Sequence, residues 1–288
     1  MKTRTIGDVT VSAIGFGGMP VSIEGRPDEA RAIATIHAAL DAGITFIDTA
    51  DAYRLPGEGI SHNELLIAKA LKSYSGDTSN VLVATKGGHL REEPVKDAWQ
   101  LNGHPEYIKK AAEASLKALG VDVIGLYQFH RPDPTVDYAD SVGAIRDLLD
   151  AGKIRMAGIS NANPEQIRLS QEILGGRLVS VQNQFSPTFR SSEPELELCD
   201  ELGIAFLPWS PLGGIGQAGQ LGSRFAPFKQ VGDAHGVSAQ VICLAWELAK
   251  SSVVIPIPGS SRPETIIDSA QAPDVELTAE EIATLDAA

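Results

Sequence analysis

Cysteine is scarce in this sequence. Its 288 residues include only Cys199 and Cys243, and their spacing matches neither a metal site nor a redox pair. Folds that depend on disulfides carry many more cysteines and occur in oxidising compartments. The sequence therefore predicts no disulfide framework and favours a reducing compartment.

Positive charge and long apolar runs are also lacking. Lysine and arginine total 24 against 37 aspartate and glutamate residues, which gives a formal net charge of −13. This charge argues against a nucleic acid and against an anionic membrane as partners. No apolar run is long enough to cross a membrane, and residues 1–7 lead into no apolar leader segment. We therefore expect a cytoplasmic protein.

What the sequence does have is a regular alternation of strands and helices. Residues 4–13 are typical of a β-hairpin, and a further strand is expected over 11–16. Apolar, strand-like runs follow at 44–47, 81–86, 123–130, 154–161, 178–182, 204–210 and 253–260. Helical patterns precede them at 28–41, 61–71, 105–119, 137–150, 164–174, 193–202 and 238–250. Such alternation indicates a parallel sheet in an α/β fold.

The sheet is predicted to close into a barrel rather than stay open. An open dinucleotide-binding sheet carries G-x-G-x-x-G after its first strand, and Gly15-Phe16-Gly17-Gly18 is only a fragment of it. A barrel gathers the carboxyl ends of its strands around one site. Polar residues occupy those ends here: Asp48, Lys86, His130, Asn161, Gln182, Ser210 and Ser260. We predict one domain over residues 1–288, a (β/α)8 TIM barrel with an N-terminal hairpin.

Asp48 ends a buried strand, where an unpaired charge is costly. Lys86 ends the next strand and is the natural partner of Asp48, either as a structural ion pair or as part of a catalytic group. Tyr53 favours the second interpretation. A phenol has a pKa of about 10, and a neighbouring ammonium is expected to lower it. Asp48, Lys86 and Tyr53 together are therefore predicted to form a tuned proton donor.

His130 ends the following strand and is either a core residue or a group that orients a substrate oxygen. A metal site is not predicted. Asp51 follows Asp48 and Asp133 follows His130 at metal-like spacings, but a convincing third ligand is missing from both.

Three segments are suited to a phosphorylated, planar cofactor. Trp209 ends a strand, where it either packs in the core or offers a flat face to a ring. Residues 213–222 are rich in glycine and are predicted to form a flap or cover. Gly259 to Arg262 open a helix with Pro263 in its first turn, and helix starts of this kind bind phosphate, with Arg262 as the cation.

Asp48, Tyr53, Lys86 and His130 together resemble the catalytic tetrad of the aldo-keto reductases. The resemblance extends over the whole chain and implies a C-terminal helical tail after the barrel. It rests on four motifs: Asp48-Thr49-Ala50-Asp51-Ala52-Tyr53, Ala84-Thr85-Lys86-Gly87, Gly158-Ile159-Ser160-Asn161 and Pro208-Trp209-Ser210-Pro211-Leu212. Tryptophan at position 209 resembles the bacterial and potassium-channel β-subunit branches.

The resemblance implies NAD(P)H, bound extended across the barrel mouth. It assigns the following residues to this cofactor: Gly18 and Met19 near the nicotinamide, with Asp48; Ser160, Asn161 and Gln182 at the carboxamide; Trp209 stacked on the ring; Ser210, Pro211, Leu212, Gly213 and Gly214 along the pyrophosphate; and Gly259, Ser260, Ser261, Arg262, Thr265 and Asp268 at the adenosine phosphate end. NADPH is the expected form, with NADH as the alternative.

The resemblance implies an NADPH-dependent oxidoreductase that reduces a small aldehyde or ketone, and a monomer is the default expectation. Tyr53 would protonate the carbonyl oxygen with the help of Lys86 and Asp48, and His130 would orient the substrate. Two alternatives stay open. One is a cofactor-bound regulatory subunit with negligible turnover. The other is an aldolase-like barrel in which Lys86 forms a Schiff base.

Overall fold

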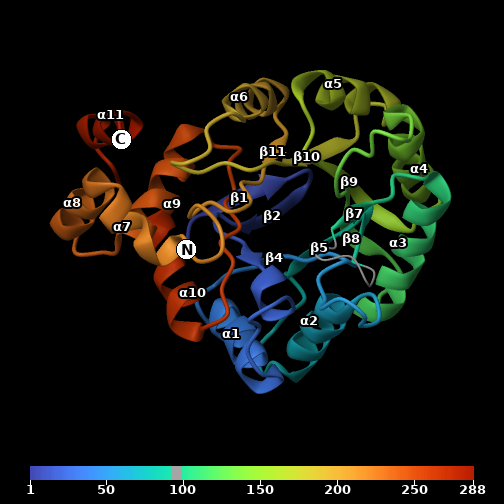
Figure 1. The fold of residues 1–288 in the computed structure, drawn as a ribbon, viewed down its shortest axis with the longest axis horizontal. Coiled ribbons are helices and arrows are strands. Elements are labelled where there is room, and N and C mark those ends of the chain that lie inside the picture. The colour runs from blue at the N-terminus through green and yellow to red at the C-terminus, as the bar shows by residue number, and fades with distance from the viewer. Residues whose placement is uncertain (92–98) are drawn as a thin grey trace.

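The computed structural model describes residues 1–91 and 99–288. Seven parallel strands form one curled sheet in the order β11-β10-β9-β8-β5-β4-β3 (Figure 1). Their bounds are Phe16–Gly17 for β3, Phe46–Asp48 for β4, Leu82–Gly87 for β5, Ile124–Phe129 for β8, Ile154–Ser160 for β9, Leu178–Gln182 for β10 and Ala205–Phe206 for β11. Every pairing between neighbouring strands of this sheet is parallel, as the apolar runs predicted.

Residues 253–259 lie between the two edges of this sheet and close it. The Ile255 amide donates to the Phe206 carbonyl of β11 at 2.8 Å, and the Gly17 amide of β3 donates to the Pro258 carbonyl at 3.0 Å. Pro256 and Pro258 carry no N–H group, so this eighth segment makes isolated bridges rather than a full ladder. The predicted barrel fold is confirmed, with its last strand weakened by proline.

Helices surround the barrel as an outer ring (Figure 1). They are α1 Glu29–Asp41, α2 His62–Ser73, α3 Pro105–Leu119, α4 Tyr138–Asp150, α5 Pro164–Ile173, α6 Glu193–Leu202, α9 Ala239–Lys250 and α10 Pro263–Ser269. Local chemistry fixes several ends. Asn163 and Gln166 form a capping box at the start of α5, and Gly120 ends α3 in the left-handed conformation. These helices match the predicted helical patterns.

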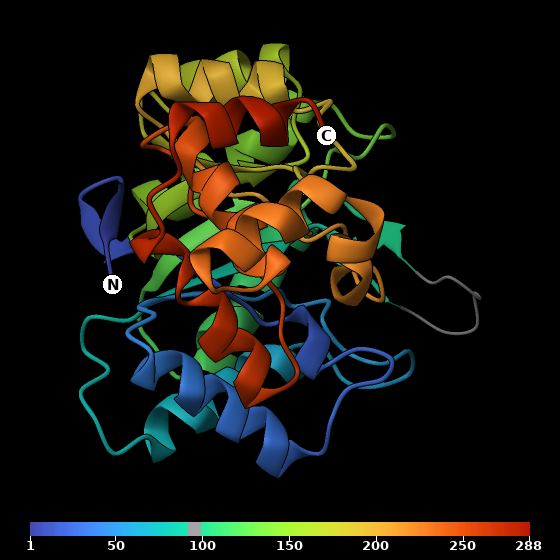
Figure 2. The same cartoon turned by 90° about the vertical axis from the view of Figure 1, so that its left-hand side faces the viewer.

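The N-terminal hairpin closes one end of the barrel. Its strands, β1 Thr3–Ile6 and β2 Val9–Ser12, pair antiparallel, as predicted. Ile6 and Val11 pack into the barrel interior with Phe46 and Leu126. Figure 2 shows the hairpin at one end and β7 at the other. The continuous strand expected over 11–16 is wrong, because β2 ends at Ser12 and the chain turns before β3 begins.

The glycine-rich segment contains more structure than its composition indicated. After the short helix η2 (Ala218–Gln220) come α7 (Leu221–Arg224) and α8 (Ala226–His235), which the sequence did not predict. Phe228 of α8 packs edge-on against Trp246 of α9, with ring centroids 5.9 Å apart. The predicted C-terminal tail is α11, Ala279–Asp286, which contacts α8 and α9 outside the ring (Figures 1 and 2).

The remaining elements of the described chain are short. They are η1 Met19–Val21, η3 Ala272–Asp274 and a small antiparallel hairpin of β6 (His89–Leu90) and β7 (Gln100–Leu101). Within the described ranges, no helix is long and apolar enough to cross a membrane.

Candidate active site

Asp48 and Lys86 form a buried ion pair at the carboxyl end of the barrel. They lie at or near the ends of the neighbouring strands β4 and β5, whose parallel register brings the side chains together. Lys86 Nζ donates to the two carboxylate oxygens of Asp48 at 2.8 and 2.7 Å, and to the Thr49 carbonyl at 2.7 Å. Lys86 is 0% exposed and Asp48 2%. Each buried charge is therefore compensated by its partner.

Tyr53 and His130 complete the group that the sequence predicted. The Tyr53 ring lies in the loop after β4, and its centroid is 5.1 Å from Lys86 Nζ. His130 follows β8 directly, and its ring meets that of Tyr53 nearly edge-on, with centroids 5.8 Å apart. Four side chains from three consecutive barrel strands and their loops therefore converge on one point.

The electrostatics of Tyr53 differ from the sequence prediction. Burial raises the pKa of Tyr53 well above its ordinary value, and the carboxylates of Asp48 and Asp51 raise it further. Lys86 was expected to lower the pKa of this phenol, but burial and the two carboxylates shift the pKa upward overall. Burial also lowers the pKa of Lys86 itself, against the opposing effect of Asp48. At neutral pH the phenol therefore keeps its proton.

His130 is a neutral imidazole in this site. Burial lowers its pKa well below the ordinary value, and His89, Lys86 and Arg131 lower it further. A neutral imidazole has one N–H donor and one acceptor nitrogen. It can therefore donate a hydrogen bond to a carbonyl oxygen without adding a full charge to the site.

His89 and Trp99 are neighbours of the site, and the assignment from sequence omitted His89. His89, on β6, stacks on His130 with ring centroids 4.2 Å apart. Trp99 meets the Tyr53 ring edge-on at 6.3 Å, and the Arg91 guanidinium lies over the indole at 4.6 Å. His89 comes only three residues after Lys86, so extending the search for polar residues past each strand end would have found it.

Asn161 ties together the polar residues at the ends of three strands. Its Oδ1 accepts hydrogen bonds from Trp209 Nε1 at 3.2 Å and from Arg131 at 3.1 Å. Its Nδ2 donates to the His130 carbonyl and to Ser160 Oγ, both at 3.0 Å. The backbone of Asn161 has a positive φ of 57°, in the left-handed region that asparagine adopts more readily than most non-glycine residues.

Gln182 lies deeper in the same network. Its Nε2 donates to Asp48 Oδ1 at 2.8 Å, and its backbone carbonyl accepts from Ser160 Oγ at 2.7 Å. The three residues expected at the carboxamide, Ser160, Asn161 and Gln182, are therefore joined to one another and to the ion pair.

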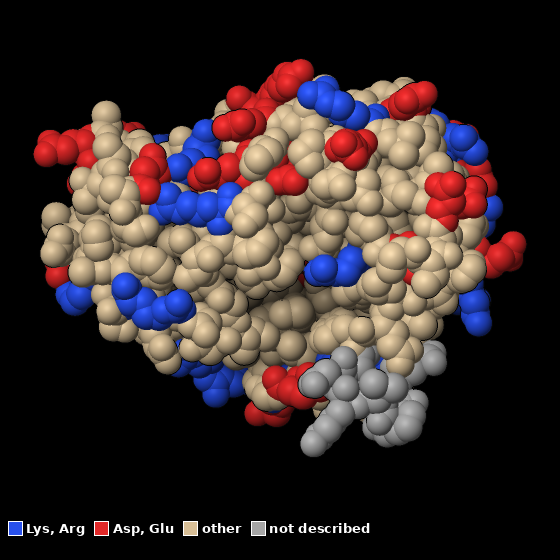
Figure 3. Space-filling model, turned by 45° about the horizontal axis from the view of Figure 1, so that its top comes forward, with Lys and Arg blue, Asp and Glu red and all other residues tan. Residues whose placement is uncertain are grey.

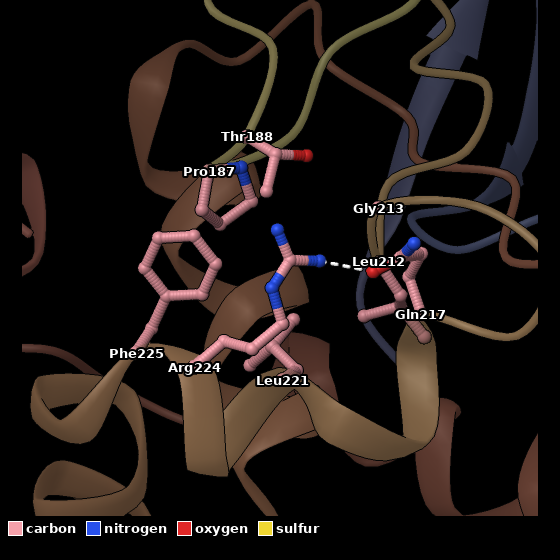
Figure 4. A pocket seen from close by; sticks show the side chains of 8 residues that line it. All are labelled: Pro187, Thr188, Leu212, Gly213, Gln217, Leu221, Arg224 and Phe225. Atoms are coloured by element: carbon pink, nitrogen blue, oxygen red, sulfur yellow. Dashed lines mark hydrogen bonds between the residues drawn. The ribbon is translucent and has the colours of Figure 1, made fainter.

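The loop after Trp209 turns sharply beside a small pocket. Ser210 has a φ of 52°, and Gly213 and Gly214 have φ values of 87° and 97°. Figure 4 shows the guanidinium of Arg224 extending from α7 toward this loop and bonded to Gln217. Eight residues line the pocket: Pro187, Thr188, Leu212, Gly213, Gln217, Leu221, Arg224 and Phe225. A guanidinium beside a glycine loop is suited to an anionic group. Arg224 was not among the residues predicted from sequence.

Comparison with known proteins decides the family. The model of the Aldo/keto reductase family matches residues 13–288. The chain belongs to the aldo/keto reductase family. The resemblance inferred from its motifs is therefore confirmed.

Three proteins illustrate the relationship. An uncharacterised oxidoreductase of Schizosaccharomyces pombe is 35% identical over 99% of this chain and 89% of its own length. A 6-dehydroglucose reductase of Novosphingobium aromaticivorans is 35% identical over 92% of this chain and 87% of its own length. The crystal structure of an aldo/keto reductase from Klebsiella pneumoniae in complex with NADP and acetate has a TM-score of 0.80 and 25% identity, with coverage of 99% and 94%.

The rim residues of this aldo/keto reductase suit a nicotinamide dinucleotide. Trp209 is half-buried, and its bond to Asn161 fixes the plane of the indole. Arg262 is exposed at the start of α10, and within residues 1–91 and 99–288 its side chain makes no ion pair. Arg224 adds a second cation near the glycine loop. Figure 3 shows a hollow in one face of the molecule with basic side chains at its edge.

Other residues assigned to the cofactor make contacts within the protein. Ser260 Oγ bonds to Thr265 Oγ1 and to the Arg262 carbonyl, and Asp268 accepts from Ser238 Oγ at 2.6 Å. A Cβ atom on Gly18 would lie 2.6 Å from Asn63 Oδ1, so close packing alone explains the glycine there. Met19 begins η1, and the Pro211 carbonyl accepts a hydrogen bond from Cys243 Sγ. Gly259 forms an isolated parallel β-bridge with Gly17, and Ser261 is half-buried.

Proposed function

We propose that this aldo/keto reductase uses NADPH to reduce an aldehyde or ketone to an alcohol, with Tyr53 as the proton donor. One observation carries the proposal: the Tyr53 ring lies 5.1 Å from an ammonium that Asp48 binds through two oxygens, beside a neutral His130. A nicotinamide cofactor supplies the hydride in this chemistry.

Tyr53 holds the proton that the carbonyl oxygen needs. Because its pKa is raised by burial, the phenol is protonated at neutral pH. Loss of the proton leaves a developing phenolate, which the Lys86 ammonium stabilises in a site of low dielectric. Asp48 keeps Lys86 charged despite burial.

His130 orients the substrate. Its neutral ring can donate to the carbonyl oxygen and hold it near the phenol of Tyr53. The aromatic side chains of Tyr53 and Trp99 limit the access of water on one side. Positioning and general acid catalysis are thus supplied by separate residues.

The cofactor assignment rests on the arrangement of the rim. We propose that Trp209 stacks on the nicotinamide, that Asn161, Ser160 and Gln182 bind its carboxamide, and that Arg262 binds the 2′-phosphate. The complex of the Klebsiella pneumoniae relative with NADP supports this choice. The remaining residues of the proposed cofactor site are those assigned from sequence: Gly18, Met19, Asp48, Ser210 to Gly214, Gly259 to Ser261, Thr265 and Asp268.

The Schiff-base alternative is disfavoured by the environment of Lys86. Its Nζ donates three hydrogen bonds and is paired with Asp48, so it is an ammonium without a free lone pair. A Schiff-base lysine must be a free amine that a carbonyl carbon can reach.

The test follows the absorbance of NADPH and of NADH with a panel of aldehydes, ketones, sugars and polyol-derived carbonyls. Turnover by the wild type that is lost in Tyr53→Phe supports the proposal. Tight cofactor binding without turnover on any carbonyl would contradict it and would favour a regulatory subunit.

A further inference from the structure

Asp51 is a buried carboxyl that the proposed mechanism does not use. It is 1% exposed, three residues after Asp48. Its backbone amide donates to the Lys86 carbonyl at 3.2 Å, and its backbone carbonyl accepts from the Ser61 amide at 2.9 Å. Both bonds fix the loop that leads to Tyr53. The position of Asp51 relative to the proposed proton donor is therefore determined by the fold.

The carboxyl of Asp51 is incompletely bonded. Oδ2 accepts a hydrogen bond from the hydroxyl of Tyr107 on α3 at 3.0 Å. Oδ1 is buried and has no hydrogen-bond partner in the described part of the chain. A buried carboxylate normally requires several donors or a cation. A protonated carboxyl carries no net charge and tolerates this environment far better.

The charges around Asp51 also favour its protonated form. Lys86, the buried lysine nearby, is already paired with Asp48. The groups that interact electrostatically with Asp51 or share its surroundings are Tyr53 and Arg54 on its own loop, Glu64 on α2, Lys86 on β5, Tyr107 on α3 and Tyr127 on β8. Glu64 is a second buried acid, bonded to the Thr85 hydroxyl. Three carboxyl groups thus surround one lysine.

The electrostatic effects on Asp51 agree with the geometry. The pKa of Asp51 is raised to about 8, mainly by burial and also by the charge of Glu64. The hydrogen bond from Tyr107 and the charge of Arg54 lower this pKa, but their effects are smaller. Asp51 in turn raises the pKa of Tyr53, so the two groups are coupled.

We propose that Asp51 is a positioning residue that acts through Tyr53: with a proton on Asp51 the phenol gives up its own proton readily, and when Asp51 ionises the reduction slows. The reason is that a carboxylate on the same loop repels the phenolate that forms as Tyr53 donates. This inference rests on the proposed function, in which Tyr53 is the acid.

The first test is the pH dependence of a single turnover, measured as NADPH oxidation at saturating carbonyl substrate. The wild-type rate is expected to fall by on the order of tenfold or more as the pH rises through about 8, because one charge about 10 Å away at an effective dielectric of about 20 changes the free energy by about 1.7 kcal/mol. Asp51→Asn keeps the shape and removes the charge, so this fall should disappear. An unchanged profile in a folded Asp51→Asn protein would overturn the proposal.

In a second variant, the fall in rate is expected to move to another pH instead of disappearing. Tyr107→Phe removes the hydroxyl that lies 3.0 Å from Asp51 Oδ2 and 3.2 Å from the His89 carbonyl. Loss of this donor destabilises the charged form of Asp51, so the fall in rate should move to higher pH. A merely structural role would lower the rate at every pH and leave the profile in place. Tyr74→Phe is the matched control, because it removes a tyrosine hydroxyl that bonds Asp41 at 2.7 Å on the surface. Its profile should equal that of the wild type.

A third measurement does not depend on turnover. Infrared difference spectra of the protein without cofactor, recorded across the same pH range, should lose a protonated carboxyl band as Asp51 ionises. The change should be smaller in Asp51→Asn by the contribution of one carboxyl, and changes of equal size in the two proteins would overturn the proposal. If the wild type turns over no carbonyl, the proposed function fails, whereas the infrared titration still decides whether Asp51 is protonated at neutral pH.

Discussion

Gln182 donates a hydrogen bond from Nε2 to Oδ1 of Asp48 at 2.8 Å, in a site where Asp48 is also bound by Lys86. The side chain therefore joins the proposed carboxamide site to the ion pair. One amide oxygen of Gln182 remains to accept a bond from a carboxamide. If Gln182 binds the carboxamide as proposed, binding of the nicotinamide is linked to the Asp48–Lys86 ion pair through this one residue.

Gln182→Leu tests this link. The change removes a hydrogen bond to a charged group, which typically contributes about 1.5–3 kcal/mol. We expect turnover to fall roughly tenfold or more and NADPH binding to weaken together with it. Stopped-flow turnover and equilibrium titration of the cofactor measure the two effects. A loss of affinity with full turnover would mean that the bond to Asp48 has no catalytic role.

Tyr53→Phe removes the proposed acid and little volume. General acid catalysis contributes roughly 10²- to 10⁴-fold, so turnover should fall by that factor while cofactor affinity is nearly kept. His89→Phe is a useful comparison, because it keeps a ring against His130 but removes a group that lowers the pKa of that histidine. Turnover of Tyr53→Phe within a few-fold of the wild type would contradict the assignment.

Trp209 should report cofactor binding by fluorescence. Stacking on the nicotinamide is expected to quench the Trp209 indole, whereas Trp246 is fully buried. NADPH titration of the wild type and of Trp209→Phe measures the quenching amplitude. The amplitude should shrink in the variant, and equal amplitudes would show that another tryptophan, such as Trp99, is responsible.

Variants of Arg262 and Arg224 should show which cofactor phosphate each arginine binds. Arg262→Ala is expected to weaken NADPH binding roughly 10- to 150-fold, since a charge-assisted hydrogen bond contributes about 1.5–3 kcal/mol. NADH lacks the 2′-phosphate and should change only a few-fold. Arg224→Ala is the matched control, because Arg224 faces the glycine loop and should weaken NADPH and NADH alike. Equal losses for both cofactors in Arg262→Ala would mean that Arg262 does not bind the 2′-phosphate.

The sequence predicted the barrel because its main determinant is local. Apolar β-branched runs and the polar residues after them repeat with the βα unit, so the order of the strands alone was enough to pair Asp48 with Lys86. The eighth strand was predicted, but its reduction to isolated bridges was not. That reduction is due to Pro256 and Pro258, which lack N–H donors. Helix α8 was missed because it is specified by tertiary contacts, such as Phe228 against Trp246, and follows a glycine-rich segment.

The pKa values of the site residues were harder to predict from sequence than the identity of these residues. Lys86 alone would lower the pKa of Tyr53, but the depth of burial and the positions of Asp48 and Asp51 reverse the direction. Burial is a property of the whole fold, and a motif cannot supply it. The stacking of His89 on His130 likewise depends on how the chain after β5 turns back, which no spacing in the sequence specifies.

Glu247 on α9 is expected to make the stability of the fold depend on pH. It is fully buried, and within residues 1–91 and 99–288 neither of its carboxyl oxygens has a hydrogen-bond partner. Burial raises the pKa of Glu247 well above its ordinary value. Below a pH of about 4.5 the folded and unfolded states are both protonated there, and no penalty arises. Above it the unfolded chain releases the proton and the folded chain keeps it, so the free energy of unfolding falls by up to about 1.4 kcal/mol for each pH unit.

Glu247→Gln cannot ionise and escapes this loss. We therefore expect the variant and the wild type to unfold at similar temperatures near pH 4.5, with the variant increasingly more stable as the pH rises toward 8. Thermal unfolding across this range measures the difference, in which the contributions of Asp51 and Glu64 cancel because both proteins contain them. Glu197→Gln, at an exposed position on α6, is the matched control and should show no growing difference. A constant offset between Glu247→Gln and the wild type at every pH would mean that Glu247 is already ionised in the folded protein, and that a donor or cation compensates it there.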